Sequence, residues 1–251
     1  MSKKPEDKET DRRKLLKLVG VAGAASALPF VGAASGTEKP SVPGKATHNH
    51  APMPENSRPA GMGYEFFNAN ESVFIEAAVD TLIPADETGP GAVETGVATY
   101  VDRQMARAYG KGDRLYLEGP FHEGTPQQGY QLSMMPSELI RMGIADVNGH
   151  TQKRFSKPFA SLSKADRIAV MMGLDARKIE LPNVPTDAFF GLLLQLTVEG
   201  YFADPLYGGN GNKASWKMIG FPGANAMYMD KIDPFRNRHY TAKPMGIQDL
   251  T

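Results

Sequence analysis

The residue types that most often carry chemistry in proteins are scarce and widely spaced in this chain. It has 251 residues, no cysteine and five histidines, none of which forms an i, i+4 pair. The lack of cysteine excludes disulfides, thiolate catalysis, iron–sulfur clusters and covalent haem attachment. The histidines are His48, His50, His122, His150 and His239. We therefore expect no catalytic, cofactor-binding or metal-binding residue here.

Carboxylates and methionines are weaker candidates. Glu199 and Asp204 flank a glycine-rich stretch, and we expect a capping or loop-bracing role for both. The 13 methionines could bind copper in an exported protein. At helical positions, however, methionine is commonly core filler, which is the role we expect.

The glycine-rich stretch is Gly208-Gly209-Asn210-Gly211, and the chain's one tryptophan, Trp216, follows five residues later. Asp204-Pro205 is expected to end the preceding helix, because a residue before proline avoids the α region. A nucleotide-binding loop is excluded, since no strand precedes the stretch and no GxGxxG spacing or following Lys-Ser/Thr pair is present. A structural Ω-type loop and a surface that faces a partner both remain, and they are compatible.

The helices that must position this loop come after an N-terminal segment with paired arginines. Arg12 and Arg13 precede Leu16 and Lys17, and a mildly apolar stretch rich in Gly and Ala follows. Paired arginines in that place indicate a twin-arginine signal peptide over residues 1–34. A transmembrane helix is disfavoured, because Lys17, Pro29 and several glycines interrupt the apolar stretch. This export route carries folded chains, and so favours a cofactor inserted before export.

Residues 35–63 are rich in Pro, Ser, Gly and Asn, have no apolar periodicity and are expected to form a flexible linker. His48 and His50 fall in this linker and are expected to be solvated. Residues 64–251 then form the globular domain.

Apolar periodicity predicts helices over 71–83, 92–109, 136–155, 164–178 and from 186 onward. Asn70, Pro136 and Ser163 supply start signals. The helix from 186 is apolar on most sides and should be the central buried one. No stretch alternates with period 2, and Gly and Pro supply 45 residues. The fold class expected is therefore all-α, irregular and rich in loops.

The charge distribution excludes one class of partner. The 28 basic and 28 acidic residues balance, and outside residues 1–34 the net charge is −3. No basic footprint of the kind that nucleic-acid binding requires is present.

The sequence resembles the gluconate 2-dehydrogenase subunit 3 family over about residues 66–225. The matching stretches are Leu82-Ile83-Pro84-Ala85-Asp86, Gly119-Pro120-Phe121, residues 197–205, Tyr207-Gly208-Gly209-Asn210 and residues 216–224. The resemblance implies a small subunit that partners an FAD-containing large subunit of the glucose–methanol–choline type and a multihaem cytochrome c. It also implies that the small subunit supports export and maturation, at the periplasmic face of the inner membrane.

On this view the chain is non-catalytic, carries no cofactor itself, is recognised by the twin-arginine translocase and presents a partner interface. The residues expected there are Asp204, Tyr207, Gly208, Gly209, Asn210, Trp216, Lys217, Gly220 and Pro222. The alternative is a free-standing periplasmic enzyme or metal-binding protein. Gluconate is favoured as the complex's substrate only by the resemblance.

Overall fold

Five helices of ten residues or more dominate the computed structural model, which describes residues 63–122, 124–125, 128, 131–225 and 227–250. These helices are α2 (Ala69–Leu82), α3 (Val97–Ala106), α4 (Pro136–Phe155), α5 (Lys164–Asp175) and α6 (Thr186–Phe202). Two short helices follow, α7 (Ala214–Ile219) and α8 (Met229–Ile232). The described residues contain two isolated β-bridges and no strand. The expected all-α, loop-rich class is confirmed for this part of the chain.

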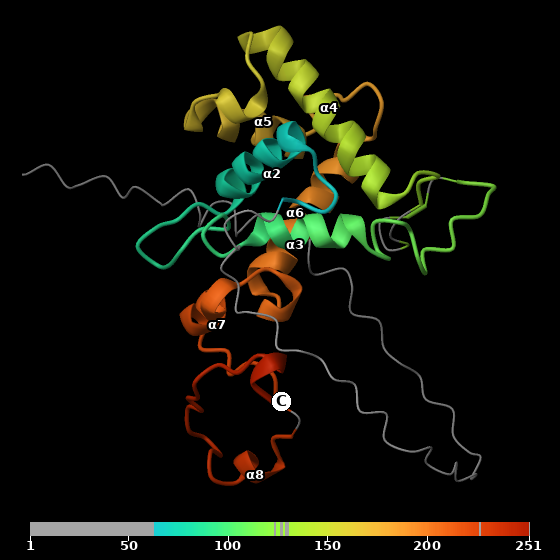
Figure 1. Ribbon diagram of the computed structural model, residues 1–251. Coiled ribbons are helices and arrows are strands. Elements are labelled where there is room, and N and C mark those ends of the chain that lie inside the picture. The colour runs from blue at the N-terminus through green and yellow to red at the C-terminus, as the bar shows by residue number, and fades with distance from the viewer. Residues whose placement is uncertain (1–62, 123, 126–127, 129–130, 226, 251) are drawn as a thin grey trace, which may run out of the picture. The chain divides into compact units, whose positions relative to one another are not determined.

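Helix α6 is the centre of the bundle. It contacts α2, α3, α4 and α5, and Figure 1 shows it running between them. Phe189, Leu193 and Leu196 on α6 are almost completely buried. A helix that is apolar around most of its circumference must be covered on most sides, and this arrangement covers it. The prediction of a central helix from 186 onward is therefore confirmed.

Side-chain caps set several of the helix starts. Asn68 Oδ1 accepts hydrogen bonds from the N–H groups of Asn70 and Glu71, and Glu71 Oε2 accepts one from Asn68 N. This capping box makes Asn68 the N-cap of α2, whereas the sequence had indicated Asn70. Pro136 opens α4 and Ser163 caps α5, both as predicted.

Two predicted helices are too long. Helix α3 begins at Val97, five residues later than expected, because Gly96 adopts a φ of +80° that a helix cannot contain. It ends at Ala106, short of the predicted residue 109. Helix α5 ends at Asp175, since Arg177 has a φ of +53° and turns the chain before Lys178.

A buried carboxylate fixes the segment that leads into α2. Asp102 on α3 accepts hydrogen bonds from the N–H groups of Glu65, Phe66 and Phe67, at 2.7, 3.0 and 3.0 Å. Arg141 lies with its guanidinium carbon 4.1 Å from the centroid of the Phe66 ring. The start of the domain is thus held to α3 and α4. The predicted signal peptide (1–34) and nearly all of the predicted linker (35–63), with Arg12, Arg13, Leu16, Lys17, His48 and His50, lie outside the described residues.

Candidate partner-binding surface

The glycine-rich loop, residues 203–213, packs directly against α6. Asp204 Oδ1 accepts a hydrogen bond from Leu206 N at 3.0 Å and caps the short 3-10 helix Pro205–Tyr207, so the predicted capping role is confirmed. Gly208 has a φ of +109°. A Cβ on Gly209 would lie 1.9 Å from the carbonyl oxygen of Gly200 on α6. Only glycine permits this conformation and this approach at low cost.

Two buried side chains hold the loop in shape. Asn210 is fully buried: its Nδ2 donates to Ala203 O, and its Oδ1 accepts from Ser215 N and Ser215 Oγ. Trp216 is 5% exposed, and its Nε1 donates to Phe202 O at 2.8 Å. These bonds tie the end of α6, the loop and the start of α7 into one unit. The polar atoms of both side chains are therefore occupied within the chain.

Beside the loop, Glu199 braces α6 against α3, which differs from the capping or loop-bracing role expected from the sequence. Glu199 Oε1 accepts from Gln195 Nε2 at 2.7 Å, and Oε2 accepts from Tyr100 OH at 3.3 Å. Burial, and then the nearby Glu199 carboxylate, raise the pKa of Tyr100 and Tyr109. Both phenols therefore stay protonated at neutral pH, as hydrogen-bond donors rather than bases.

The C-terminal segment, residues 214–250, is anchored to the loop by a few polar contacts. Asp204 Oδ2 accepts a hydrogen bond from Ile247 N at 2.8 Å. Lys213 Nζ pairs with Asp249 Oδ2 at 2.6 Å. Within the segment itself, Met245 bonds to Pro222 and Ala224 through backbone groups, at 3.1 and 2.7 Å. Asp204 thus serves both as a cap and as the link to the end of the chain.

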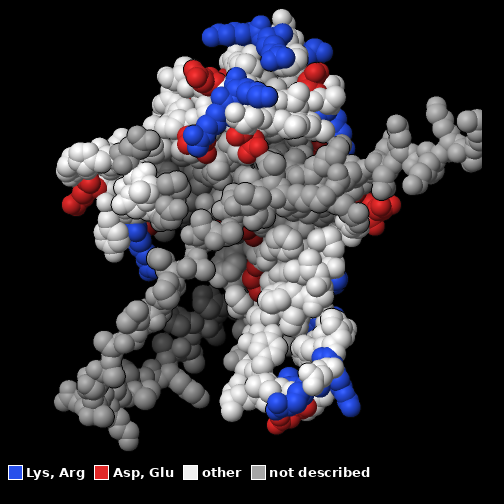
Figure 2. Space-filling model, turned by 180° about the vertical axis from the view of Figure 1, so that it is seen from behind, with Lys and Arg blue, Asp and Glu red and all other residues white. Residues whose placement is uncertain are grey.

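This C-terminal segment exposes many large apolar side chains. It supplies nine of the 17 exposed large hydrophobic residues among the described residues, but only one of the 33 buried ones, Trp216. The nine are Ile219, Phe221, Met227, Tyr228, Met229, Ile232, Met245, Ile247 and Leu250. Figure 2 shows a mostly uncharged surface in the lower part of the molecule, with Lys, Arg and acidic side chains gathered at its tip. Many exposed large apolar side chains within one segment are typical of protein interaction sites.

The structure divides the predicted interface residues into two groups. Tyr207, Lys217 and Gly220 are exposed, and Asp204 and Pro222 are partly exposed. Gly208, Gly209, Asn210 and Trp216 are buried within the chain and shape the loop from inside. The interface assignment itself stays a prediction, and its accessible part rests on the first group.

Sequence reasoning missed the apolar residues 227–250 and the polar residues Lys243 and Asp249 near them. A usable signal was present. Met227-Tyr228-Met229, Ile232 and Ile247 stand among prolines and charged residues, where no helix is long enough to bury them. Apolar residues in such a context favour a surface that another molecule covers.

No group of three or more His, Asp or Glu able to hold a metal ion occurs in the described part of the chain. None of the described helices combines the length and apolar character required to span a bilayer.

Comparison with known protein families gives a match that covers most of the described helices. A family model described as gluconate 2-dehydrogenase subunit 3 matches residues 69–223, which extends from the first residue of α2 to the Gly223 bridge. No curated protein and no solved structure matches the chain. The match covers more than half of the sequence and includes the bundle, the glycine-rich loop and α7. The chain belongs to the gluconate 2-dehydrogenase subunit 3 family.

Proposed function

We propose that this chain is the non-catalytic small subunit of a flavin-dependent gluconate 2-dehydrogenase complex. The large subunit would carry FAD and oxidise the sugar acid, and a multihaem cytochrome c would accept the electrons. The small subunit would escort the large subunit through twin-arginine export and stabilise it afterwards. The complex would then lie at the periplasmic face of the inner membrane.

One observation carries the proposal beyond the family name. Among the described residues of the C-terminal segment, nine large apolar side chains are exposed to solvent and Trp216 alone is a buried hydrophobic residue. A permanent subunit of a complex gains stability by burying such side chains against its partner, at roughly 25 cal/mol per Å2 of apolar surface. The exposed segment therefore supports a role in assembly.

The export role is supported by the sequence alone. Arg12 and Arg13 stand in the pattern of a signal that exports folded proteins, and this chain has no recognisable cofactor motif. Such a signal is useful if a partner protein binds its cofactor in the cytoplasm and is then exported together with this chain. A flavoprotein without a signal peptide of its own would be such a partner.

The test co-expresses the chain with the flavoprotein large subunit from the same organism and compares it with an Arg12→Lys, Arg13→Lys double variant. We expect gluconate-dependent dye reduction in the periplasm with the parent chain. With the variant, activity and flavoprotein antigen should stay in the cytoplasm. A flavoprotein that reaches the periplasm in both strains would rule out the escort role.

A further inference from the structure

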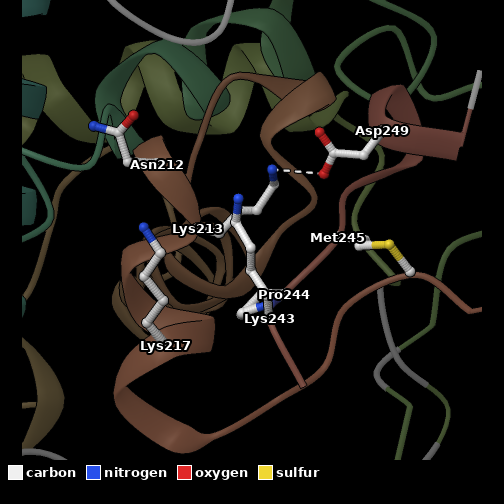
Figure 3. A pocket seen from close by; sticks show the side chains of 7 residues that line it. All are labelled: Asn212, Lys213, Lys217, Lys243, Pro244, Met245 and Asp249. Atoms are coloured by element: carbon white, nitrogen blue, oxygen red, sulfur yellow. Dashed lines mark ion pairs between the residues drawn. The ribbon is translucent and has the colours of Figure 1, made fainter.

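A cleft of about 470 Å3 lies between the glycine-rich loop, α7 and the end of the chain. We call it the lysine cleft. Its lining residues are Asn212, Lys213, Lys217, Lys243, Pro244, Met245 and Asp249. Figure 3 shows the Lys217 and Lys243 side chains pointing to the same side as the ion pair of Lys213 with Asp249. Two segments about 30 residues apart in sequence therefore form one charged surface.

The carboxylate of the cleft is already engaged. Lys213 Nζ lies 2.6 Å from Asp249 Oδ2, and the Lys213 side chain is only 14% exposed. Gly246 N also donates to Asp249 Oδ2. The hydrogen bond from Lys213, followed by that from Gly246, holds the pKa of Asp249 below its usual range. Asp249 therefore stays ionised and neutralises Lys213.

The other two lysines are left to face solvent. Within the described part of the chain, neither Lys217 nor Lys243 forms an ion pair with a carboxylate. Both residues are exposed, and each ammonium group offers three hydrogen-bond donors. The described lining therefore presents excess positive charge to whatever enters the cleft.

We propose that the lysine cleft receives an acidic segment of the large subunit, whose carboxylates pair with Lys217 and Lys243. This inference rests on the proposed function and adds that the segment of the large subunit that contacts the cleft is acidic. Charge complementarity of this kind orients a complex and speeds its formation.

Continuity with the apolar surface favours a protein carboxylate over a small free acid. Met245 lines the cleft and is itself exposed, and Ile219 and Ile247 stand two residues from Lys217 and Met245. A site built for a small acid would enclose its charged groups, whereas these lysines lie open at the edge of an apolar surface. Apolar contacts beside exposed charges are the usual composition of a protein interface.

The residues that line the cleft lie partly inside and partly outside the family match. Asn212, Lys213 and Lys217 lie inside the matched residues 69–223, whereas Lys243, Met245 and Asp249 lie beyond them. The cleft thus combines a family element with a segment outside the match. We expect Lys243 to contribute to the choice of this chain's own partner.

The experiment uses the full chain with an affinity tag inserted within residues 36–60, far from the cleft in sequence, co-expressed with the large subunit. A Lys217→Glu, Lys243→Glu double variant reverses both charges, and Lys217→Arg, Lys243→Arg keeps them. The matched control is Lys153→Glu, Lys157→Glu, which makes the same charge change at the C-terminal end of α4. Captured flavoprotein is measured at low and at physiological salt.

We expect the double Glu variant to capture at least about fivefold less flavoprotein than the parent, with a weaker salt dependence. The Arg variant and the α4 control should capture as the parent does. An unchanged thermal midpoint shows that the double Glu variant is folded, and a Lys217→Gln, Lys243→Gln variant should show a smaller loss. Equal capture by the parent and the double Glu variant would overturn the inference and leave the proposed function standing.

Other outcomes point elsewhere and also overturn it. If gluconate raises the thermal midpoint of the parent but not of the double Glu variant, and capture is equal, the cleft binds a small acid. If capture is equal but binding to anionic lipid vesicles falls, the cleft faces a membrane. If the parent captures no flavoprotein at all, the proposed function fails first.

Discussion

The bundle of α2–α6 and the C-terminal segment differ in where they place their large apolar side chains. The bundle places almost all of the buried apolar residues around α6, and α2 and α5 begin with side-chain caps. The described residues of the C-terminal segment form two short α-helices and the 3-10 helix Ile247–Leu250, with one buried aromatic residue and nine exposed large apolar ones. The bundle therefore buries its apolar residues within the chain, whereas the segment leaves most of its large apolar side chains exposed.

The contacts between the two regions sharpen this difference. Asp204 and Lys213 in the loop hold the segment through a hydrogen bond and an ion pair, and Trp216 donates a hydrogen bond to Phe202 O of α6. Partly exposed ion pairs contribute little to stability, typically less than about 1 kcal/mol. Beyond Trp216, which is buried, the segment is therefore positioned by polar contacts more than it is stabilised by them.

The largest loss of stability should come from a substitution at the centre of the bundle. Leu193→Ala removes a completely buried side chain on α6 and leaves a cavity, so the free energy of unfolding should fall by about 3 kcal/mol. Chemical denaturation of the full chain measures this. Leu194→Ala, on the same helix at a partly exposed position, should cost clearly less. Equal losses at the two sites would contradict the central position of α6.

The second effect tests whether the glycine-rich loop belongs to the bundle. Asn210→Gly removes three buried hydrogen bonds but keeps a residue suited to its φ of +50°, so unfolding should become easier by about 2 kcal/mol. Asn212→Gly is the matched control, because Asn212 has a φ of +55° and is exposed. Its cost should be below about 0.5 kcal/mol. Similar values for both would mean that Asn210 does not hold the loop.

The sequence predicted the bundle well where signals are local. Pro136 and Ser163 mark helix starts by their own chemistry, and the long, mostly apolar stretch after residue 186 favours a buried helix. The predicted start of α3 at residue 92 is wrong because Gly96 is not helical. Its positive φ is set by close approach to the loop, since a Cβ there would lie 2.8 Å from Gly208 O. Such a long-range contact leaves no local signal.

The candidate surface was predicted only in part for the same reason. The sequence identified the loop and the capping role of Asp204, but not that Asn210 and Trp216 turn inward, which depends on the carbonyls of Ala203 and Phe202. The lysine cleft required the tail to return to the loop. The tail is held there by the Asp204 contact with Ile247, 43 positions away, and by the Lys213 ion pair with Asp249.

A smaller effect on stability, which depends on pH, is expected near the C-terminal end of α4. Burial, followed by the charges of Arg154 and Lys153, lowers the pKa of His150 below its ordinary 6.5. Between these two pKa values the unfolded chain binds more protons than the folded one, so stability falls as pH drops below about 6.5. His150→Gln should flatten the dependence of the thermal midpoint between about pH 7 and pH 5.5. Arg154→Gln should flatten it partly, and an unchanged slope in both variants would contradict this origin.

The smallest effect on folding should accompany a clear effect on assembly. Met229 and Ile232 are 74% and 59% exposed, so Met229→Ser, Ile232→Ser should change the free energy of unfolding by less than about 0.5 kcal/mol. The same variant should capture less flavoprotein than the parent, because it removes apolar area that the partner would bury. Met172→Ser, at a 62% exposed position on α5, is the control and should change neither quantity. If the C-terminal variant destabilises the isolated chain and capture falls only in proportion, the segment is a weak part of the fold and the contrast between the two regions disappears. If stability is kept and capture falls, exposed apolar residues in this segment serve association, and the bundle serves to present them.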